Sequence, residues 1–274
     1  MDGSNHFWLV KTDADGNIQW KNIYGIGNSD CRAYSMIQTD DGGYALAGTI
    51  YRGVLGGPGI LLVKTDAFGG LQWSNYEGEG IAEMGEGYAY SLVQTIDGGY
   101  ALAGYALFGY TDFWLVKTDA DGNMQWDNTY NGGGSSEHAY SLVQTGDGEY
   151  VMAGFTNSVA EGGETDFWLV KTDSTGNQLW NRTYGGAGDE EAHSLVQTDD
   201  GEYMIAGYTD SFGAGGYDFW LVKTERVSDS STSMVLLIVV IAVAVVCFGL
   251  IVYFIKIKKK AQLLSQEHTR FSAS

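Results

Sequence analysis

Proline, cysteine and basic residues are scarce in this chain of 274 residues. There is one proline, and there are two cysteines, of which Cys247 lies in a long apolar run. Cys31 therefore has no evident partner, which excludes a disulfide framework. The 15 Lys and Arg are outnumbered by 34 Asp and Glu, giving a net charge of −19. Such an acidic chain argues against a nucleic-acid partner, because phosphates would be repelled.

A sustained helical period is also missing, except in the apolar run. The chain is instead rich in glycine, with 40 residues, and in tyrosine, with 18. Short apolar segments bounded by Gly, Asp and Asn are typical of strands joined by tight turns. We therefore expect an all-β fold for the body of the chain.

The apolar run predicts a membrane anchor. Residues 234–255 are 22 uncharged residues, long enough to cross a bilayer as a helix. The basic stretch "KIKKK" at 256–260 follows directly, so the positive-inside rule predicts a cytoplasmic tail at 256–274. The body would then lie outside the cell, joined by a polar linker at 225–233, with the lipid bilayer as one partner. Tail-anchored insertion is disfavoured, because it would carry four lysines across the membrane.

The body is a repeat array with a period of about 53 residues. The lysine of "FWLVKT" recurs at Lys11, Lys64, Lys117, Lys171 and Lys223. Each unit contains four strand-like segments: A ("SLVQT"), B ("YALAG"), C ("FWLVKT") and D (around "QW"). Four antiparallel strands per unit predict the blades of a β-propeller over residues 1–224. A flat solenoid is the alternative.

Along the chain the segments run CD, then ABCD three times, then ABC. This order predicts about four blades and a half. Because the array begins in the middle of a unit, we expect that further blades and a signal sequence precede Met1.

The "D-x-x-G-N-x-x-W" core of "TDADGNMQW" and "TDSTGNQLW" resembles the tryptophan-docking motif of pyrroloquinoline-quinone-type propellers. The longer run of "AYSLVQTIDGGYALAG" at 89–104 and "DFWLVKTD" at 112–119 is similar to short β-propeller repeats of archaeal and bacterial surface proteins. This resemblance implies that one tryptophan in each unit packs against the next blade. The tryptophans concerned are Trp20, Trp73, Trp126 and Trp180. Some members of the wider family are dehydrogenases, but no vicinal cysteine pair or quinone-site cluster occurs here.

The turns between segments C and D resemble the start of a calcium-binding loop. "DADGN" at 13–17 and 119–123 offers oxygen ligands, but a calcium loop needs further ligands and a distal Glu. The copies at 66–70 and 173–177 also lack the middle acid. A hairpin turn is therefore the favoured interpretation. We expect no cofactor, with calcium as the open alternative.

Ligand binding is expected on the face that carries the B–C and D–A loops, because these loops are longer and differ between units. Tyrosine beside carboxylates suits a sugar or a cation. The candidate ligand-binding residues are Asp30, Glu86, Glu137, Asp189, Glu190, Tyr34, Tyr90 and Tyr140. For any one of them, a solvated loop or a core tyrosine is the alternative.

Three further features of the sequence bear on function less directly than the loops do. Asn181 begins the N-x-S/T sequon of this chain and is a candidate for glycosylation. The repeated lysine of segment C and glutamine of segment A are expected to make contacts between neighbouring units. No Ser/His/Asp or Cys/His constellation is evident.

These patterns predict a membrane-anchored extracellular binding module for a protein, glycan or matrix ligand, and not an enzyme. The alternatives are an extracellular enzyme on the same scaffold, glycan-active or quinoprotein-like, and a structural component of the cell surface. An acid or base cluster that breaks the repeat symmetry would favour the enzyme, and the sequence shows only dispersed acids.

Overall fold

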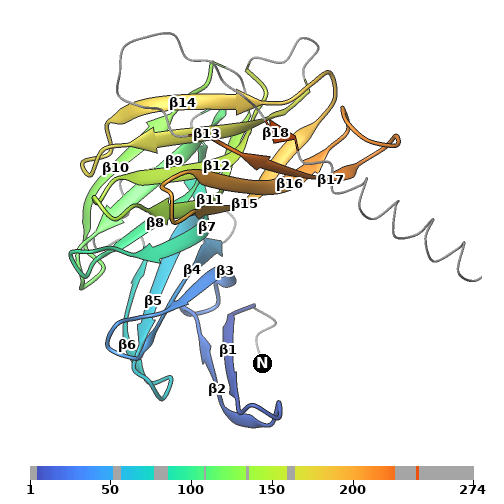
Figure 1. Cartoon of the computed structure of the whole chain (residues 1–274). Coiled ribbons are helices and arrows are strands. Elements are labelled where there is room, and N and C mark those ends of the chain that lie inside the picture. Colours follow the sequence, from blue (N-terminus) through green and yellow to red (C-terminus); the bar gives the residue numbers. More distant parts are fainter. Residues whose placement is uncertain are drawn as a thin grey trace, which may run out of the picture.

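The computed structural model describes residues 5–51, 57–76, 86–107, 109–133, 136–158 and 164–225, and the backbone of 239–240 (Figure 1). Every regular element in these ranges is a β-strand. The strands form a two-stranded sheet followed by four antiparallel sheets of four strands each. We name the first sheet the half-blade and the others blades 1 to 4.

The strand order in every blade is the chain order. The half-blade consists of β1 (Phe7–Thr12) and β2 (Ile18–Tyr24). Blade 1 consists of β3 (Asp30–Gln38), β4 (Tyr44–Tyr51), β5 (Pro58–Thr65) and β6 (Leu71–Tyr76). Blade 2 consists of β7 (Glu86–Gln94), β8 (Tyr100–Leu107), β9 (Thr111–Thr118) and β10 (Met124–Tyr130). Blade 3 consists of β11 (Glu137–Gln144), β12 (Tyr150–Thr156), β13 (Asp166–Thr172) and β14 (Gln178–Tyr184). Blade 4 consists of β15 (Glu190–Gln197), β16 (Tyr203–Thr209), β17 (Asp218–Lys223) and β18 (Val239–Val240).

These sheets confirm the predicted all-β repeat of propeller-like blades. Segments A, B, C and D each form a strand, and neighbouring strands pair antiparallel. The four A strands (β3, β7, β11 and β15) contact one another along the inner side of the array. A backbone hydrogen bond to a side chain helps to join them, because Leu195 N donates to Ser141 Oγ at 3.0 Å.

No helix in the described part of the chain is long and apolar enough to span a membrane. The predicted helix at 234–255 lies outside the described residues except for β18, as do residues 226–233 and the tail at 256–274. At residues 239–240 the structure has a strand where the apolar run predicts a helix. Its two residues pair with the open outer edge of β17, at Val222 and Lys223. The anchor stays a prediction.

An aromatic pair joins strand C of one blade to strand C of the next. Phe113 of blade 2 and Trp168 of blade 3 have ring centroids 4.5 Å apart, and both rings are buried. The two ends of the array expose the equivalent positions, with Trp8 62% and Phe219 68% exposed. In Figure 1 these two ends, the half-blade and blade 4, lie apart.

A second aromatic contact between blades involves the tryptophans of strand D. Trp20 packs on Gly69, Trp73 on Gly122, and Trp126 on Gly176, each in the C–D turn of the following blade. At Gly176, an added Cβ would come within 2.7 Å of the Trp126 ring. All four tryptophans, Trp180 on β14 included, also contact the first tyrosine of strand B in the following blade, with ring centroids 5.8 to 6.2 Å apart.

Candidate ligand-binding site

A β-bulge in each strand A presents one extra residue on the inner side of the array. In blade 2 the register shifts between Ala89 and Ser91, so Tyr90 is the extra residue. The glycine of the repeated "AG" makes room for the bulge, because a Cβ at Gly104 would come within 1.7 Å of the Tyr88 carbonyl oxygen. Bulges re-aim side chains and are enriched beside functional sites.

The four bulge residues form a continuous row, which we call the inner aromatic row. Its members are Tyr34, Tyr90, Tyr140 and His193, one from each blade. Successive ring centroids are 4.9, 5.3 and 5.0 Å apart. Tyr34 is 41% exposed and the His193 side chain 50% exposed, while the two middle rings are partly buried. The row is therefore an aromatic surface open to solvent.

A second row of rings supports the first. Its members are Tyr51, Tyr88, Tyr105, His138 and Phe155. Tyr105 stacks on both neighbours, with centroids 4.8 Å from Tyr88 and 3.9 Å from His138. It also lies 5.8 Å from Tyr90 of the inner row. Because every ring of the two rows except Tyr34 and Tyr51, at the blade 1 end, contacts two or more other rings, the surface is stiff and preorganised.

Burial keeps His138, Tyr105 and Tyr140 uncharged near neutral pH. Burial lowers the pKa of His138 to about 4, so its imidazole is neutral at pH 7. Burial likewise raises the pKa values of Tyr105 and Tyr140, which keep their hydroxyl protons. The tyrosine hydroxyls can therefore both donate and accept hydrogen bonds.

The two ends of the row differ in charge. At the blade 1 end, the Arg32 guanidinium lies 5.3 Å from the centre of the Tyr51 ring. At the blade 4 end, Glu191 Oε2 lies 3.7 Å from His193 Nε2. Arg32 and Glu191 occupy the same repeat position, two residues before the bulge, so this position breaks the repeat symmetry.

The structure brings together the three predicted tyrosines, Tyr34, Tyr90 and Tyr140, but does not bring the predicted acids to them. Asp30, Glu86, Glu137 and Glu190 are each the first residue of a strand A. Glu86 precedes Tyr90 by four residues, or about 13 Å along an extended strand. The acids therefore mark the loop end of the blades and not the aromatic row.

Most of these acids accept hydrogen bonds from neighbouring loops or strands and so hold the loops in place. Glu190 is fully buried and accepts hydrogen bonds from Gly186 N at 2.8 Å, Thr209 Oγ1 at 2.5 Å and Ser211 N at 3.1 Å. Glu137, also fully buried, accepts from Thr156 Oγ1 at 3.0 Å. Asp30 accepts from Asn5 N at 2.7 Å, and Asp189 accepts from Thr165 N at 3.1 Å. Glu86 is exposed at the start of β7.

The C–D turns have the hydrogen bonds of hairpin turns. Asp119 Oδ1 accepts from Asp121 N at 3.0 Å and Asn123 N at 2.8 Å, and Asp13, Asp66 and Asp173 repeat the pattern. The carboxylate is thus used to close the turn, as the favoured interpretation predicts. No cluster of three His, Cys, Asp or Glu that could hold a metal ion occurs among the described residues.

The repeated lysine and glutamine differ in what they join. Lys64 Nζ lies 2.7 Å from Asp41 Oδ2 of its own blade, whereas Lys171 of blade 3 also interacts with Tyr203 of blade 4, so the predicted contact between blades holds for only part of the lysines. The glutamine does link blades, because Gln94 Oε1 of blade 2 accepts from Asp40 N of blade 1 at 2.9 Å. Asn181 is exposed on β14, and its glycosylation stays a prediction.

Sequence reasoning missed the second row and the role of His193. His138 lies three residues and His193 one residue before the serine of segment A, so His193 occupies the same repeat position as Tyr140. The sequence did contain a signal that could have found the second row. Within a nearly invariant repeat, the position two before the bulge reads Arg32, Tyr88, His138 and Glu191.

No protein-family model matches the chain, and no curated protein matches it significantly. Among solved structures, it is similar to a xylan beta-1,4-xylosidase from Bacillus halodurans C-125, with 17% identity and a TM-score of 0.43. It is also similar to a bifunctional GH43-CE protein from Bacteroides eggerthii (18%, TM-score 0.38) and to an exo-1,5-alpha-L-arabinanase from a bovine ruminal metagenomic library (11%, TM-score 0.37).

The matches cover 75%, 79% and 77% of this chain and 42%, 26% and 77% of the respective structures. The chain thus spans less than half the length of the first two. The expectation that the chain is not an enzyme is corrected here, because these comparisons with glycan-active enzymes contradict it. The finer resemblance to quinone-type repeats of prokaryotic surface proteins stays a prediction.

Proposed function

We propose that this chain is a carbohydrate-recognition module that binds a glycan along the inner aromatic row. One observation carries the proposal: four aromatic side chains from four blades are in ring contact and remain partly exposed. An exposed, contiguous aromatic surface marks an interaction site. The C–H groups on the less polar face of a sugar ring can pack on these rings, while tyrosine hydroxyls bond to its hydroxyl groups.

The negative charge of the chain favours a glycan over a nucleic acid, which is the other class of ligand that stacks on rows of aromatic rings. Nucleic-acid bases stack on such rings as well, but single-strand binding also needs a basic groove along the backbone. This chain has a net charge of −19, and Glu191 lies beside the row. A neutral or weakly charged sugar polymer fits this surface better than a polyphosphate.

We further propose that the module is displayed outside the cell on a single-pass anchor at residues 234–255, with the tail at 256–274 in the cytoplasm. The support is the uncharged run of 22 residues and the lysines that follow it. Protease added to intact cells is expected to remove the body and spare the tail. Protection of the body would contradict this topology.

Binding is tested by applying the detergent-solubilised full chain to an array of neutral and acidic glycans. The Tyr90→Ala variant is expected to lose at least tenfold in affinity, because the central ring of the row is removed. Trp8→Ala is the matched control, since Trp8 is an exposed ring outside the row. The proposal fails if no glycan binds, or if both variants weaken binding equally.

Glycan hydrolysis is a second candidate function, favoured by one pair of carboxyl groups. Asp166 lies beside Glu190, and burial together with that neighbour raises the pKa of Asp166. Its Oδ1 atom has no hydrogen-bond partner within the described part of the chain. Two neighbouring carboxyl groups, one of them inclined to hold its proton, resemble the acid and base of glycoside hydrolysis.

Release of reducing sugar from soluble polysaccharides, xylan and arabinan among them, tests this second candidate. If it is right, the wild-type chain releases sugar and Asp166→Asn does not, although the variant still binds glycan. Binding without sugar release by the wild-type chain would refute hydrolysis and leave the recognition module intact.

A further inference from the structure

A cleft of about 680 Å³ lies between blades 1 and 2, where the A–B turn of blade 1 meets the C–D turn of blade 2. Asp40 and Asp41 of the first turn and Ala120 and Asp121 of the second turn line it. Trp73, on β6, adds an aromatic wall, and its ring is partly exposed. None of the rings of the inner aromatic row lines this cleft, so the two features are separate.

The lysine in the cleft already has a full set of partners. Lys64 is only 5% exposed. Its Nζ atom donates to Asp41 Oδ2 at 2.7 Å, the Thr65 carbonyl oxygen at 2.8 Å and Gln72 Oε1 at 2.9 Å. An ammonium group has three donors, so all of them are in use. The Asp41 carboxylate thus balances the lysine charge.

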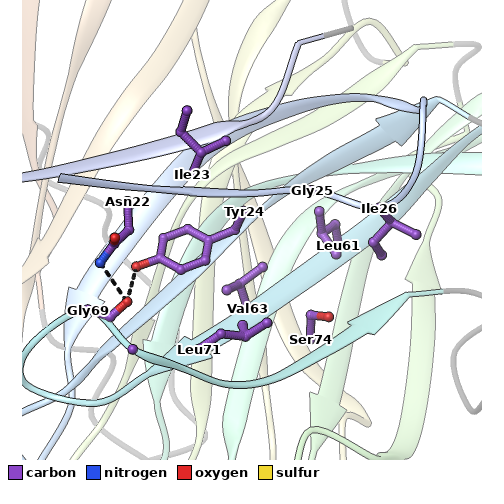
Figure 2. Close-up of a pocket in the computed structure, with 11 residues that line it drawn as sticks. Asn22, Ile23, Tyr24, Gly25, Ile26, Leu61, Val63, Gly69, Leu71 and Ser74 are labelled. Atoms are coloured by element: carbon purple, nitrogen blue, oxygen red, sulfur yellow. Dashed lines mark hydrogen bonds between the residues drawn. The ribbon is translucent and has the colours of Figure 1, made fainter. Parts of the chain in front are cut away.

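The C–D turn of blade 2 is fastened to blade 1. Asn75 Nδ2 donates to the Asp121 carbonyl oxygen at 2.9 Å. Its equivalent Asn22 makes a similar bond at the preceding junction, to the Gly69 carbonyl oxygen at 2.9 Å, as Figure 2 shows. The tryptophan of strand D docks on the same turn. The wall of the cleft that carries Asp121 is therefore held in place by the fold.

The Asp40 and Asp121 side chains have no partner of their own. Asp40 N donates to Gln94 Oε1 at 2.9 Å, and Asp121 N donates to Asp119 Oδ1 at 3.0 Å, so both backbones are fixed. Within the part of the chain that the structure describes, neither carboxylate accepts a hydrogen bond or forms an ion pair. Two negative charges, one from each blade, are left uncompensated at this cleft.

The two acids occur together at this junction and not at the next one. The residue in the position of Asp40 is Ile96 in blade 2, and the residue in the position of Asp121 is Thr175 in blade 3. The other polar and aromatic residues of the cleft recur at the next junction, as Lys117, Gln125, Trp126, Gln144 and Tyr150. Blades 2 and 3 therefore pack together without either acid, and the fold does not require them.

Two free carboxylates beside a partly exposed indole suit an organic cation. An ammonium group is attracted to the face of a tryptophan ring and makes charge-assisted hydrogen bonds to carboxylates. A metal ion needs more ligands, and no cluster of three His, Cys, Asp or Glu that could hold one occurs among the described residues.

We propose that this cleft binds a linear alkyl diammonium ion, of the polyamine class. One ammonium group bonds to the Asp40 carboxylate and the other to the Asp121 carboxylate, while the alkyl chain packs on the Trp73 indole. The net charge of −19 draws cations toward the chain. This site does not depend on the glycan-binding surface, so either proposal can fail alone.

The test is a calorimetric titration of the detergent-solubilised full chain with putrescine at constant ionic strength. The expected Kd is about 1 mM, a range in which ligands of this size bind. Asp40→Ile and Asp121→Thr install the residues of the next junction and should each weaken putrescine binding at least fivefold. n-Butylammonium has the same alkyl chain with a single charge and should bind the wild type at least fivefold more weakly than putrescine.

Asp199→Ile and Asp15→Thr are the matched controls. They make the same changes at the same turn positions in blade 4 and in the half-blade, outside the cleft, and should bind putrescine as the wild type does. All four aspartates are exposed in turns, so the variants are expected to fold. No binding of putrescine to the wild type, equal binding of n-butylammonium, or equal effects of the cleft variants and their controls would overturn the proposal.

Discussion

The stability of the fold is predicted to decrease between pH 7.5 and pH 5 because of His138 in the second aromatic row. The ring stacks on Tyr105 at 3.9 Å and lies 4.9 Å from Phe155, with no carboxylate in the ring contacts. Burial lowers its pKa from 6.5 to about 4. The unfolded chain therefore takes up a proton more readily than the folded chain between these two values.

The sign and size of this effect follow from proton linkage. Above pH 6.5 the imidazole is neutral in both the folded and the unfolded chain, and the stability of the fold is unaffected by this group. As the pH falls from 6.5 toward 4 the unfolded chain binds the proton first, so the free energy of unfolding decreases. For a fully buried ring the loss at pH 5 would be about 2 kcal/mol, at 1.36 kcal/mol for each pKa unit. Because the His138 ring is only partly buried, we expect about 1 kcal/mol.

Urea unfolding at pH 7.5 and pH 5 measures this loss for the wild type and for His138→Phe. The phenyl ring keeps the stacking and cannot be protonated, and all other groups titrate equally in both chains. The free energy of unfolding of the variant should therefore change less with pH, by about 1 kcal/mol. Equal pH dependence of the two chains would refute the assigned burial of His138.

Two further predictions concern contacts that hold the blades. Gly176→Ala should destabilise the fold by about 3 kcal/mol in urea unfolding, since its Cβ would meet Trp126 in addition to the strain at positive φ. Gly16→Ala has the same φ of 84° but open space around the Cβ, and should cost only about 1 kcal/mol; equal losses would contradict the docking. Asp41→Asn should cost about 1 kcal/mol at neutral pH, because Lys64 loses its ionic partner. Hydrogen bonds from Lys64, Thr39 and Gly43 lower the pKa of Asp41 to about 2, so this difference from the wild type should vanish as the pH falls from 3.8 through 2, and persistence at pH 2 would contradict the ion pair.

The repeat explains why the fold was predictable from the sequence. Each unit shows the same four strand signals, and a local pattern repeated at a constant period constrains the pairing of neighbours. The pairing of Gln94 with the preceding blade follows from the same logic. Lys64 shows the limit of inferring contacts from repetition, because a repeated residue can be needed within each blade as well as between blades.

The site was only partly predictable, because the bulge in strand A is not visible as a turn signal. The repeat gives Tyr90 and His193 equivalent positions, but the period of two in a strand does not predict which side of the sheet a bulge residue faces. The distance of the predicted acids from the aromatic row was not predictable for another reason. Glu137 and Glu190 occupy the same repeat position at the start of strand A, and their burial depends on Thr156 and Thr209 of the neighbouring strand.

The most direct test of the recognition surface is hydroxyl-radical footprinting of the full chain with and without the tightest-binding glycan of the array. The glycan should protect Tyr34, Tyr90 and Tyr140, while oxidation of Trp8 and Phe219 at the ends of the array stays unchanged. Protection of Trp8 or Phe219, with the three tyrosines as reactive as before, would contradict binding along the inner aromatic row.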